Sequence, residues 1–219
     1  MTGVSAFRGY RVGKEDFLLS LGSLKSRFRI VGPVRTGRNG SQTAFKELSE
    51  GDELFMQYRE TAISPGKYLF FKPKQEILTF EVAAHESDGK NTLKEISFSE
   101  VGPSGEKFML VGVHPCDLNA ILYLDRTYCT DPYYAAVREN TIIIALNCTD
   151  VSDFCFCSSV GTGPHLKAET GYDALLTDLG EDYLVEIKSE RAEQVFNFPK
   201  VEAVADDFEV KTKAENALL

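Results

Sequence analysis

The stretch that decides the fold runs from Lys107 to Cys148 and reads KFMLVGVHPCDLNAILYLDRTYCTDPYYAAVRENTIIIALNC. It opens and closes with nearly continuous apolar runs, Lys107–Val113 and Thr141–Leu146. Such runs are typical of strands that are covered on both faces. Between them, Asp117–Leu124 and Tyr133–Glu139 read as helices. The order strand, helix, helix, strand predicts an α/β lobe with parallel pairing.

Both helices carry start signals. Asp117 is expected to cap the first helix, because a carboxylate at this position can accept backbone N–H bonds that have no partner in the first turn. Asp131 is expected to cap the second, with Pro132 in the first turn, where a missing N–H costs nothing.

The rest of the chain adds elements around this lobe. Lys14–Phe28 repeats its apolar residues at helical spacing and is expected to bury one face. The remaining expected elements are a strand at Ile30–Val34, which Gly32-Pro33 bends or ends, a turn at Gly37–Ser41, a short extended piece at Leu54–Tyr58, strands at Ile77–Val82, Tyr172–Leu176 and Tyr183–Ser189, and a loop or lobe boundary at His85–Leu93. We therefore predict an α/β protein with an α+β N-terminal lobe (1–105) and an α/β cysteine-bearing lobe (106–219) that ends in an acidic tail. The sheet is expected to be parallel or mixed, with flanking helices.

Composition and charge exclude some classes of function. The 219 residues are 43% apolar and 26% charged, as in ordinary globular proteins, and no apolar run approaches the ~20 residues of a membrane span. The net charge of −9 disfavours nucleic acid as a partner. The N-terminus has no apolar core of a secretory signal, so we expect a cytoplasmic, reducing location, where thiols are more often ligands than disulfides.

Four cysteines form the candidate site: Cys116, Cys148, Cys155 and Cys157. The first two follow the two apolar strands, and ligands of parallel sheets gather beyond the carboxyl ends of strands. If Cys155-Phe156-Cys157 is extended, its two thiols point the same way and Phe156 points away, where it could shield the site from water. Four thiols at one place can hold one metal centre, either an iron–sulfur cluster or zinc. Cys129 lies outside the pattern and is interpreted as structural.

The ligand spacing favours iron–sulfur over zinc. All-thiolate zinc sites usually bring two close pairs of ligands, whereas here two ligands come singly from strand ends. His114 is either an alternative ligand or a hydrogen-bonded residue at the rim. Gly161–Pro164 (GTGP) is interpreted as a turn that wraps the metal site; a flavin phosphate resting on it, as in a flavin-binding reductase, is the weaker reading. A structural scaffold with a zinc or empty four-cysteine site is the main alternative.

The chain resembles a known family at these residues. VGVHPCDLNAILYLDR, DPYYAAVRENTIIIALNCT, CFCSSVGTGP and GYDALLTDLG, together with RFRIVGPV and SPGKYLFFKPKQEILTF near the N-terminus, are similar to sulfhydrogenase beta subunits and to the related subunit of anaerobic sulfite reductase. The resemblance runs over nearly the whole chain.

This resemblance implies an electron-transfer subunit rather than a catalytic one. Such subunits relay electrons within anaerobic oxidoreductase complexes, between a flavin-containing or ferredoxin-type partner and a catalytic hydrogenase or sulfite reductase subunit. The resemblance implies that Cys116, Cys148, Cys155 and Cys157 bind one cluster, for which we choose [4Fe–4S], although four cysteines also fit [2Fe–2S]. Family members usually continue into a module with two ferredoxin-type clusters, and this sequence has no CxxCxxCxxxCP run.

Overall fold

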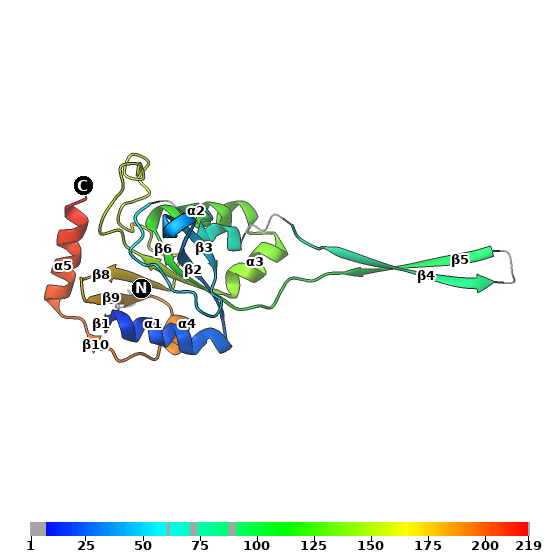
Figure 1. Cartoon of the computed structure of the whole chain (residues 1–219), viewed down its shortest axis with the longest axis horizontal. Helices are drawn as coiled ribbons and strands as arrows, with labels where there is room; N and C mark the ends of the chain where they lie inside the picture. Colours follow the sequence, from blue (N-terminus) through cyan, green and yellow to red (C-terminus); the bar gives the residue numbers. More distant parts are fainter. Residues whose placement is uncertain (1–7, 61, 71–73, 88–90, 219) are drawn as a thin grey trace, which may run out of the picture.

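The computed structural model describes residues 8–60, 62–70, 74–87 and 91–218, with the backbone alone for 84–87 and 91–94. The described residues form a mixed sheet of eight strands in the order β10-β1-β9-β8-β7-β6-β2-β3, and a separate ribbon of two strands, β4 and β5 (Figure 1). The strands of the sheet are β1 (Arg8–Gly13), β2 (Arg29–Thr36), β3 (Gln42–Glu47), β6 (Phe108–Val113), β7 (Thr141–Leu146), β8 (Ala174–Asp178), β9 (Asp182–Ile187) and β10 (Val201–Glu202). The helices are α1 (Lys14–Ser23), α2 (Pro115–Tyr128), α3 (Pro132–Glu139), α4 (Glu190–Val195) and α5 (Ala205–Asn216), with short 3-10 turns η1 (Leu24–Ser26), η2 (Arg38–Gly40) and η3 (Gly66–Leu69).

The centre of the sheet is parallel, as predicted. Strands β2, β6, β7 and β8 run parallel to one another, whereas β3, β9, β1 and β10 join through antiparallel pairs. The chain crosses the sheet in one direction from β1 to β2 and in the other from β6 to β7. Right-handed crossovers then place α1 on one face and α2 with α3 on the other, an arrangement that Figure 1 shows. The predicted α/β class is confirmed.

The two apolar runs lie at the middle of this sheet. Every residue of β6 and every residue of β7 is buried, because helices or loops cover both faces. Met109, Leu110, Ile143 and Ile144 have no solvent exposure at all. Fully burying each such side chain stabilises the fold by about 1.5–3 kcal/mol. The strands that position the candidate cysteines therefore belong to the core.

One helix start was predicted correctly and the other was not. The Asp131 carboxylate accepts hydrogen bonds from the backbone N–H groups of Tyr133 and Tyr134, both at 2.9 Å, so the cap of α3 is confirmed. Helix α2, however, begins at Pro115, and Asp117 lies inside its first turn rather than before it. Proline suits that first position because its missing N–H would have no helical partner there.

Three predictions in the N-terminal half need correction. The helix expected over Lys14–Phe28 ends at Ser23 and continues as the 3-10 turn η1; Phe17, Leu21, Leu24 and Phe28 of its apolar face are buried as expected, but Leu18 is exposed. Strand β2 does not end at Gly32-Pro33 but pairs with β3 as far as Thr36. Leu54–Tyr58 is irregular, and Phe55 only donates its N–H to the Pro33 carbonyl, at 2.7 Å.

The segment 85–93 was interpreted as a loop or lobe boundary, and this was wrong for the described part. β4 (Leu78–Ser87) and β5 (Asn91–Glu100) form one long antiparallel ribbon that includes residues 85–87 and 91–93; residues 88–90 lie outside the described residues. The division into lobes 1–105 and 106–219 stays a prediction, and the eight-stranded sheet takes strands from both ranges. Among the described residues, no helix has both the length and the apolar character needed to cross a bilayer.

Candidate metal centre

The site is built where β6 and β7 end side by side. The two strands are parallel neighbours, and Val113, the last residue of β6, pairs with Ala145 of β7. The chain then continues to Cys116 on one side and to Cys148 on the other. Since adjacent strands are about 4.8 Å apart, two residues that follow these ends belong to the same edge of the sheet. The predicted placement of these cysteines at strand C-terminal ends agrees with this topology.

Cys116 is the second residue of α2, so its thiol lies at a helix N-terminus. Desolvation by the surrounding protein raises the pKa of this thiol to about 11, and the negative charges of Asp117 and Cys157 add to the rise. The backbone N–H groups of Asp117 and Cys116 hydrogen-bond to the sulfur and lower the pKa, but the desolvation is larger. These N–H groups are the kind that stabilise a metal-bound thiolate.

Cys148 links the four candidate ligands. Burial raises the pKa of its thiol far above the usual range, and the charges of Cys116, Cys157 and Cys155 raise it further, in that order. The loop that carries Cys155 and Cys157 continues from Cys148, and Gly163, which lies close to the Cys157 sulfur, also lies close to Pro115 at the start of α2.

The loop after β7 carries the last two cysteines, and it does not form the extended segment on which the shared direction of their thiols depends. Residues 153–160 form successive turns, in which Cys155 donates its N–H to the Ser152 carbonyl at 3.0 Å. Phe156 is 71% exposed and Phe154 85% exposed, so neither shields the cysteines from solvent. The loop, yellow in Figure 1, projects from the body beside α2.

The GTGP segment contacts this cysteine loop. A side-chain carbon added at Gly163 would lie 2.9 Å from the sulfur of Cys157 and 3.9 Å from the side chain of Pro115. Only glycine allows so close an approach. Thr162 also donates its backbone N–H to the Cys157 carbonyl, at 2.9 Å. The predicted wrapping of the site by Gly161–Pro164 agrees with these contacts.

Sequence reasoning missed a stacked pair that forms one wall of the site. The rings of Tyr58 and His114 are parallel, with centroids 3.8 Å apart, and both residues are buried. The Tyr58 hydroxyl donates to the Gly112 carbonyl at 2.6 Å. Gly112 has a φ of 79° and lies at a bulge that shifts the β6–β7 register between Val111 and Val113. No local pattern in the sequence connects Tyr58 with residues more than fifty positions away.

A cavity of about 290 Å³ opens beside this wall. Its lining includes Tyr58, His114 and Cys148, together with Arg59 and Asp150, which form an ion pair at 2.9 Å. Burial lowers the pKa of His114 to about 4, so its ring is neutral at physiological pH. The lining thus offers one thiol, one neutral imidazole, the Arg59–Asp150 ion pair and the Asp178 carboxylate, which pairs with Lys14 at 2.8 Å.

The chemistry of the donors fits a metal group that binds thiolates, but the spacing is not that of a single ion. Among the described residues, no three His, Cys, Asp or Glu side chains lie close enough together to hold one metal ion. Cys129 lies at the opposite end of α2 from Cys116, which is about 20 Å along the helix axis. It is exposed and has no contact with the four-cysteine edge.

Asn147, the residue before Cys148, connects the end of β7 to three other parts of the fold. Its buried amide donates to the Thr177 hydroxyl at 3.3 Å and to the Glu215 carboxylate at 2.7 Å, and its oxygen accepts the Leu166 N–H at 3.0 Å. The three partners belong to β8, α5 and the loop that returns from the cysteines. Asn147 therefore ties Cys148 to three other parts of the fold.

Asn147→Ala is expected to lower the free energy of unfolding by about 2–3 kcal/mol, because it leaves buried partners unsatisfied. Urea denaturation of both proteins measures this change. Glu215→Gln is the matched control, since an amide oxygen can still accept the Asn147 N–H, and it should stay within about 0.5 kcal/mol of wild type. A cost for Asn147→Ala as small as that of the control would contradict the role of this network.

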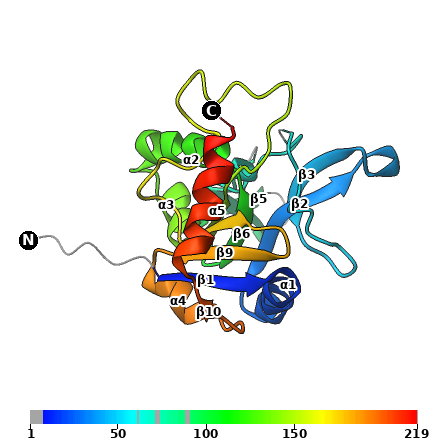
Figure 2. The same cartoon turned by 90° about the vertical axis from the view of Figure 1, so that its left-hand side faces the viewer.

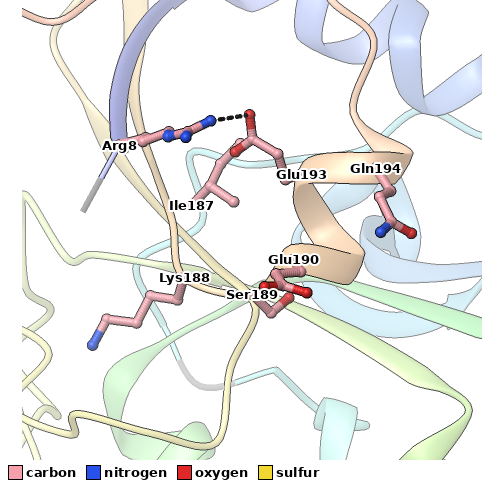
Figure 3. Close-up of a pocket in the computed structure, with 7 residues that line it drawn as sticks. All are labelled: Arg8, Ile187, Lys188, Ser189, Glu190, Glu193 and Gln194. Atoms are coloured by element: carbon pink, nitrogen blue, oxygen red, sulfur yellow. Dashed lines mark hydrogen bonds and ion pairs between the residues drawn. The ribbon is translucent and has the colours of Figure 1, made fainter. Parts of the chain in front are cut away.

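A second cavity, of about 320 Å³, lies at the far side of the sheet between β1, β9 and α4 (Figure 3). Arg8 pairs there with Glu193 at 3.5 Å, and Lys188 donates to the Glu169 carbonyl at 2.7 Å. The lining carries no cysteine or histidine. It is therefore unrelated to the cysteine edge.

Fold and site together define an α/β protein that gathers cysteines beyond the ends of neighbouring parallel strands. The chain is 32% identical over 185 residues to Sulfhydrogenase 2 subunit beta of Pyrococcus furiosus. The match covers 83% of this chain and 49% of the relative, so the chain spans about half the length of that protein. The chain belongs to the sulfhydrogenase beta subunit family. No protein-family model matches it, and no solved structure matches it.

Proposed function

We propose that this chain is an iron–sulfur electron-transfer subunit of a multi-subunit oxidoreductase. Cys116, Cys148, Cys155 and Cys157 would bind one cluster, of the [4Fe–4S] type. The single observation that carries the proposal is the placement of Cys116 and Cys148 just beyond the C-terminal ends of the neighbouring parallel strands β6 and β7, with the Cys157 sulfur packed close to Gly163. The name of the Pyrococcus furiosus relative, a sulfhydrogenase subunit, supports the assignment to an oxidoreductase complex.

The arrangement of the thiols favours a cluster over zinc. Four thiolates around one zinc ion each lie about 2.3 Å from the metal, which requires a tight group. In a [4Fe–4S] cluster each cysteine binds its own iron, so the sulfurs stand farther apart. Here Cys116 and Cys148 come singly from the ends of neighbouring strands rather than as close pairs, which agrees better with the larger centre.

When bound, such a cluster accepts and donates single electrons. The chain's own residues would hold it and set its surroundings. The N–H groups at the start of α2 would stabilise the Cys116 thiolate, and the stacked Tyr58 and His114 would form one wall beside Cys148. The exposed loop around Cys155 leaves the other side open to a partner. We propose that the electrons pass between a flavin-containing or ferredoxin-type partner and a hydrogenase- or sulfite-reductase-like subunit.

A scaffold subunit with a zinc or empty site is the second candidate. One finding favours the empty form over zinc: in the described part of the chain, no three His, Cys, Asp or Glu side chains form a group that could hold one metal ion.

Anaerobic purification of the full chain distinguishes the electron-transfer subunit from the scaffold subunit. We expect about four irons and four acid-labile sulfides per chain, a broad visible absorption that bleaches on reduction with dithionite, and an EPR signal in one of the two redox states. Metal analysis on the same sample measures zinc. Stoichiometric zinc, or a colourless protein without iron, would establish the scaffold and exclude the redox role.

A further inference from the structure

The ribbon of β4 and β5 stands away from the body of the protein. Its ten paired positions run from Leu78 opposite Glu100 to Ser87 opposite Asn91. Ten residues of antiparallel strand extend about 34 Å. Figure 1 shows the ribbon leaving the body in a direction away from the cysteine loop, with no helix or strand packed along it. The Tyr133 hydroxyl donates to the Val101 carbonyl at 2.6 Å near its base.

The described part of the ribbon has one apolar face. Residues directly opposite each other in an antiparallel pair point to the same face. The apolar face, as we call it below, consists of Leu78, Phe80, Val82, Ile96 and Phe98, and Glu100, opposite Leu78, places one carboxylate at its base. Phe80 and Phe98 form its centre: they are an opposite pair, their rings are 6.5 Å apart, and each is 65% exposed. The other face carries Thr79, Glu81, Ala83, Glu95, Ser97 and Ser99.

A two-stranded ribbon of this kind is not expected to be stable in water without further packing. An isolated pair of strands is at best marginally stable, and independent stability requires a third strand or packing of an apolar face. Here the apolar side chains alternate with polar ones in register, yet no described part of the chain covers them. Contiguous apolar patches rimmed by polar residues mark interaction sites.

We propose that the apolar face of the ribbon docks a different subunit of the complex, one whose surface presents an apolar groove rimmed by lysine and arginine. The proposal rests on the complex membership proposed above, but it does not depend on the cluster. The ribbon and the cysteine loop project from different parts of the molecule (Figures 1 and 2), so one partner on the ribbon leaves the loop free for another.

Charge selects a basic partner over a second copy of this chain. Residues 76–100 contain six acidic and two basic residues. The side chains described in this range include Glu76, Glu81, Glu95 and Glu100 and no lysine or arginine. Two such ribbons, each on a chain of net charge −9, would repel one another, whereas complementary charge around an apolar centre attracts and orients a partner.

The test uses the full chain, affinity-tagged and expressed in its native host, and isolated anaerobically with its complex. The variant Phe80→Thr/Phe98→Thr removes the aromatic centre but keeps residues that favour strands. Thr79→Glu/Ser97→Glu changes the same two strands on the opposite face and is the matched control. A photoreactive p-benzoylphenylalanine in place of Phe98 reports which surface lies against the ribbon. Sedimentation of each purified chain alone measures self-association.

We expect the aromatic variant to retain less than about a tenth of one co-purifying subunit, since buried aromatic anchors dominate interface energies. The control should retain all of it. Crosslinks from position 98 should fall in that subunit, on an apolar strip flanked by lysine or arginine. Retention by the aromatic variant, crosslinks to other surfaces, or no crosslinks would overturn the proposal, as would dimers of the chain alone that require Phe80 and Phe98.

Iron and sulfide content of the same samples keeps the two proposals separate. The ribbon variants should contain as much iron as the wild type, because their substitutions lie far from the cysteine edge. Loss of the subunit with iron retained supports docking by the ribbon. A complex that depends on the ribbon but contains no iron would refute the redox role and leave the docking surface in place.

Discussion

Replacing Cys157 with serine is expected to remove most of the iron from the anaerobically purified protein. Even substitutions outside the first ligand shell lower metal affinity by about 10- to 100-fold, so the loss of a ligand should exceed about 100-fold. The Cys157 sulfur packs against Gly163, near Pro115 at the start of the helix that carries Cys116. Iron and sulfide analysis, with EPR of the reduced protein, measures the loss. Cys148→Ser should behave in the same way.

Cys129→Ser is the matched control. Cys129 is a thiol of the same chain, but it lies at the far end of α2, where it is exposed and its thiol donates to the Arg126 carbonyl at 3.8 Å. Its replacement should leave iron content and EPR signal unchanged. An equal loss of iron from Cys129→Ser would show that the ligand assignment is wrong, and full iron retention by Cys157→Ser would show the same.

Asp173→Ala is expected to destabilise the fold by about 3–5 kcal/mol, the largest effect on stability that we predict. Asp173 is 2% exposed, and its carboxylate accepts from the Ile143 N–H at 2.8 Å, the Ser189 hydroxyl at 2.6 Å and the Arg191 guanidinium at 2.7 Å. Alanine would leave these donors without their acceptor. Because Ile143 belongs to β7, the loss would also loosen the strand that leads to Cys148.

Urea denaturation measures this prediction. Asp182→Ala is the control, because Asp182 pairs with Arg11 in an ion pair whose arginine side chain is 53% exposed, and such pairs contribute at most about 1 kcal/mol. We expect the midpoint to fall much further for Asp173→Ala, with an unchanged denaturant slope. Similar midpoints for the two variants would contradict a structural role for the Asp173 network.

Local sequence predicted the centre of the fold well. The run Thr141–Leu146 is a strand with the expected bounds, and Lys107–Val113 differs from β6 by one residue. Continuous β-branched and apolar residues allow few alternatives to a strand covered on both faces. The Asp131 cap could also be predicted, because the carboxylate bonds only to residues two and three positions further along the chain. The start of α2 was missed because Asp117 mimics a cap although Pro115 already begins the helix.

The ribbon shows where local reading fails. Ile77–Val82 was recognised as a strand, but the polar segment from His85 was interpreted as a loop. Its strand character depends on pairing with Asn91–Glu100, a partner that a local pattern does not reveal. The turn conformation around Cys155 was missed for a related reason. Alternation of two cysteines around Phe156 suits a strand, yet no neighbouring strand pairs with this segment in the described residues.

By itself, the sequence determined the buried strands and the helix whose N-cap is Asp131, because each depends on residues close together in the chain. It also indicated the four cysteines as candidate ligands, because two of them directly follow buried strands. Only the tertiary structure decided that β2 pairs in parallel with β6, that Tyr58 stacks on His114, and that the ribbon exposes an apolar face. These features join segments far apart in sequence. Their free energy comes from packing and pairing across the whole fold, which no short stretch encodes.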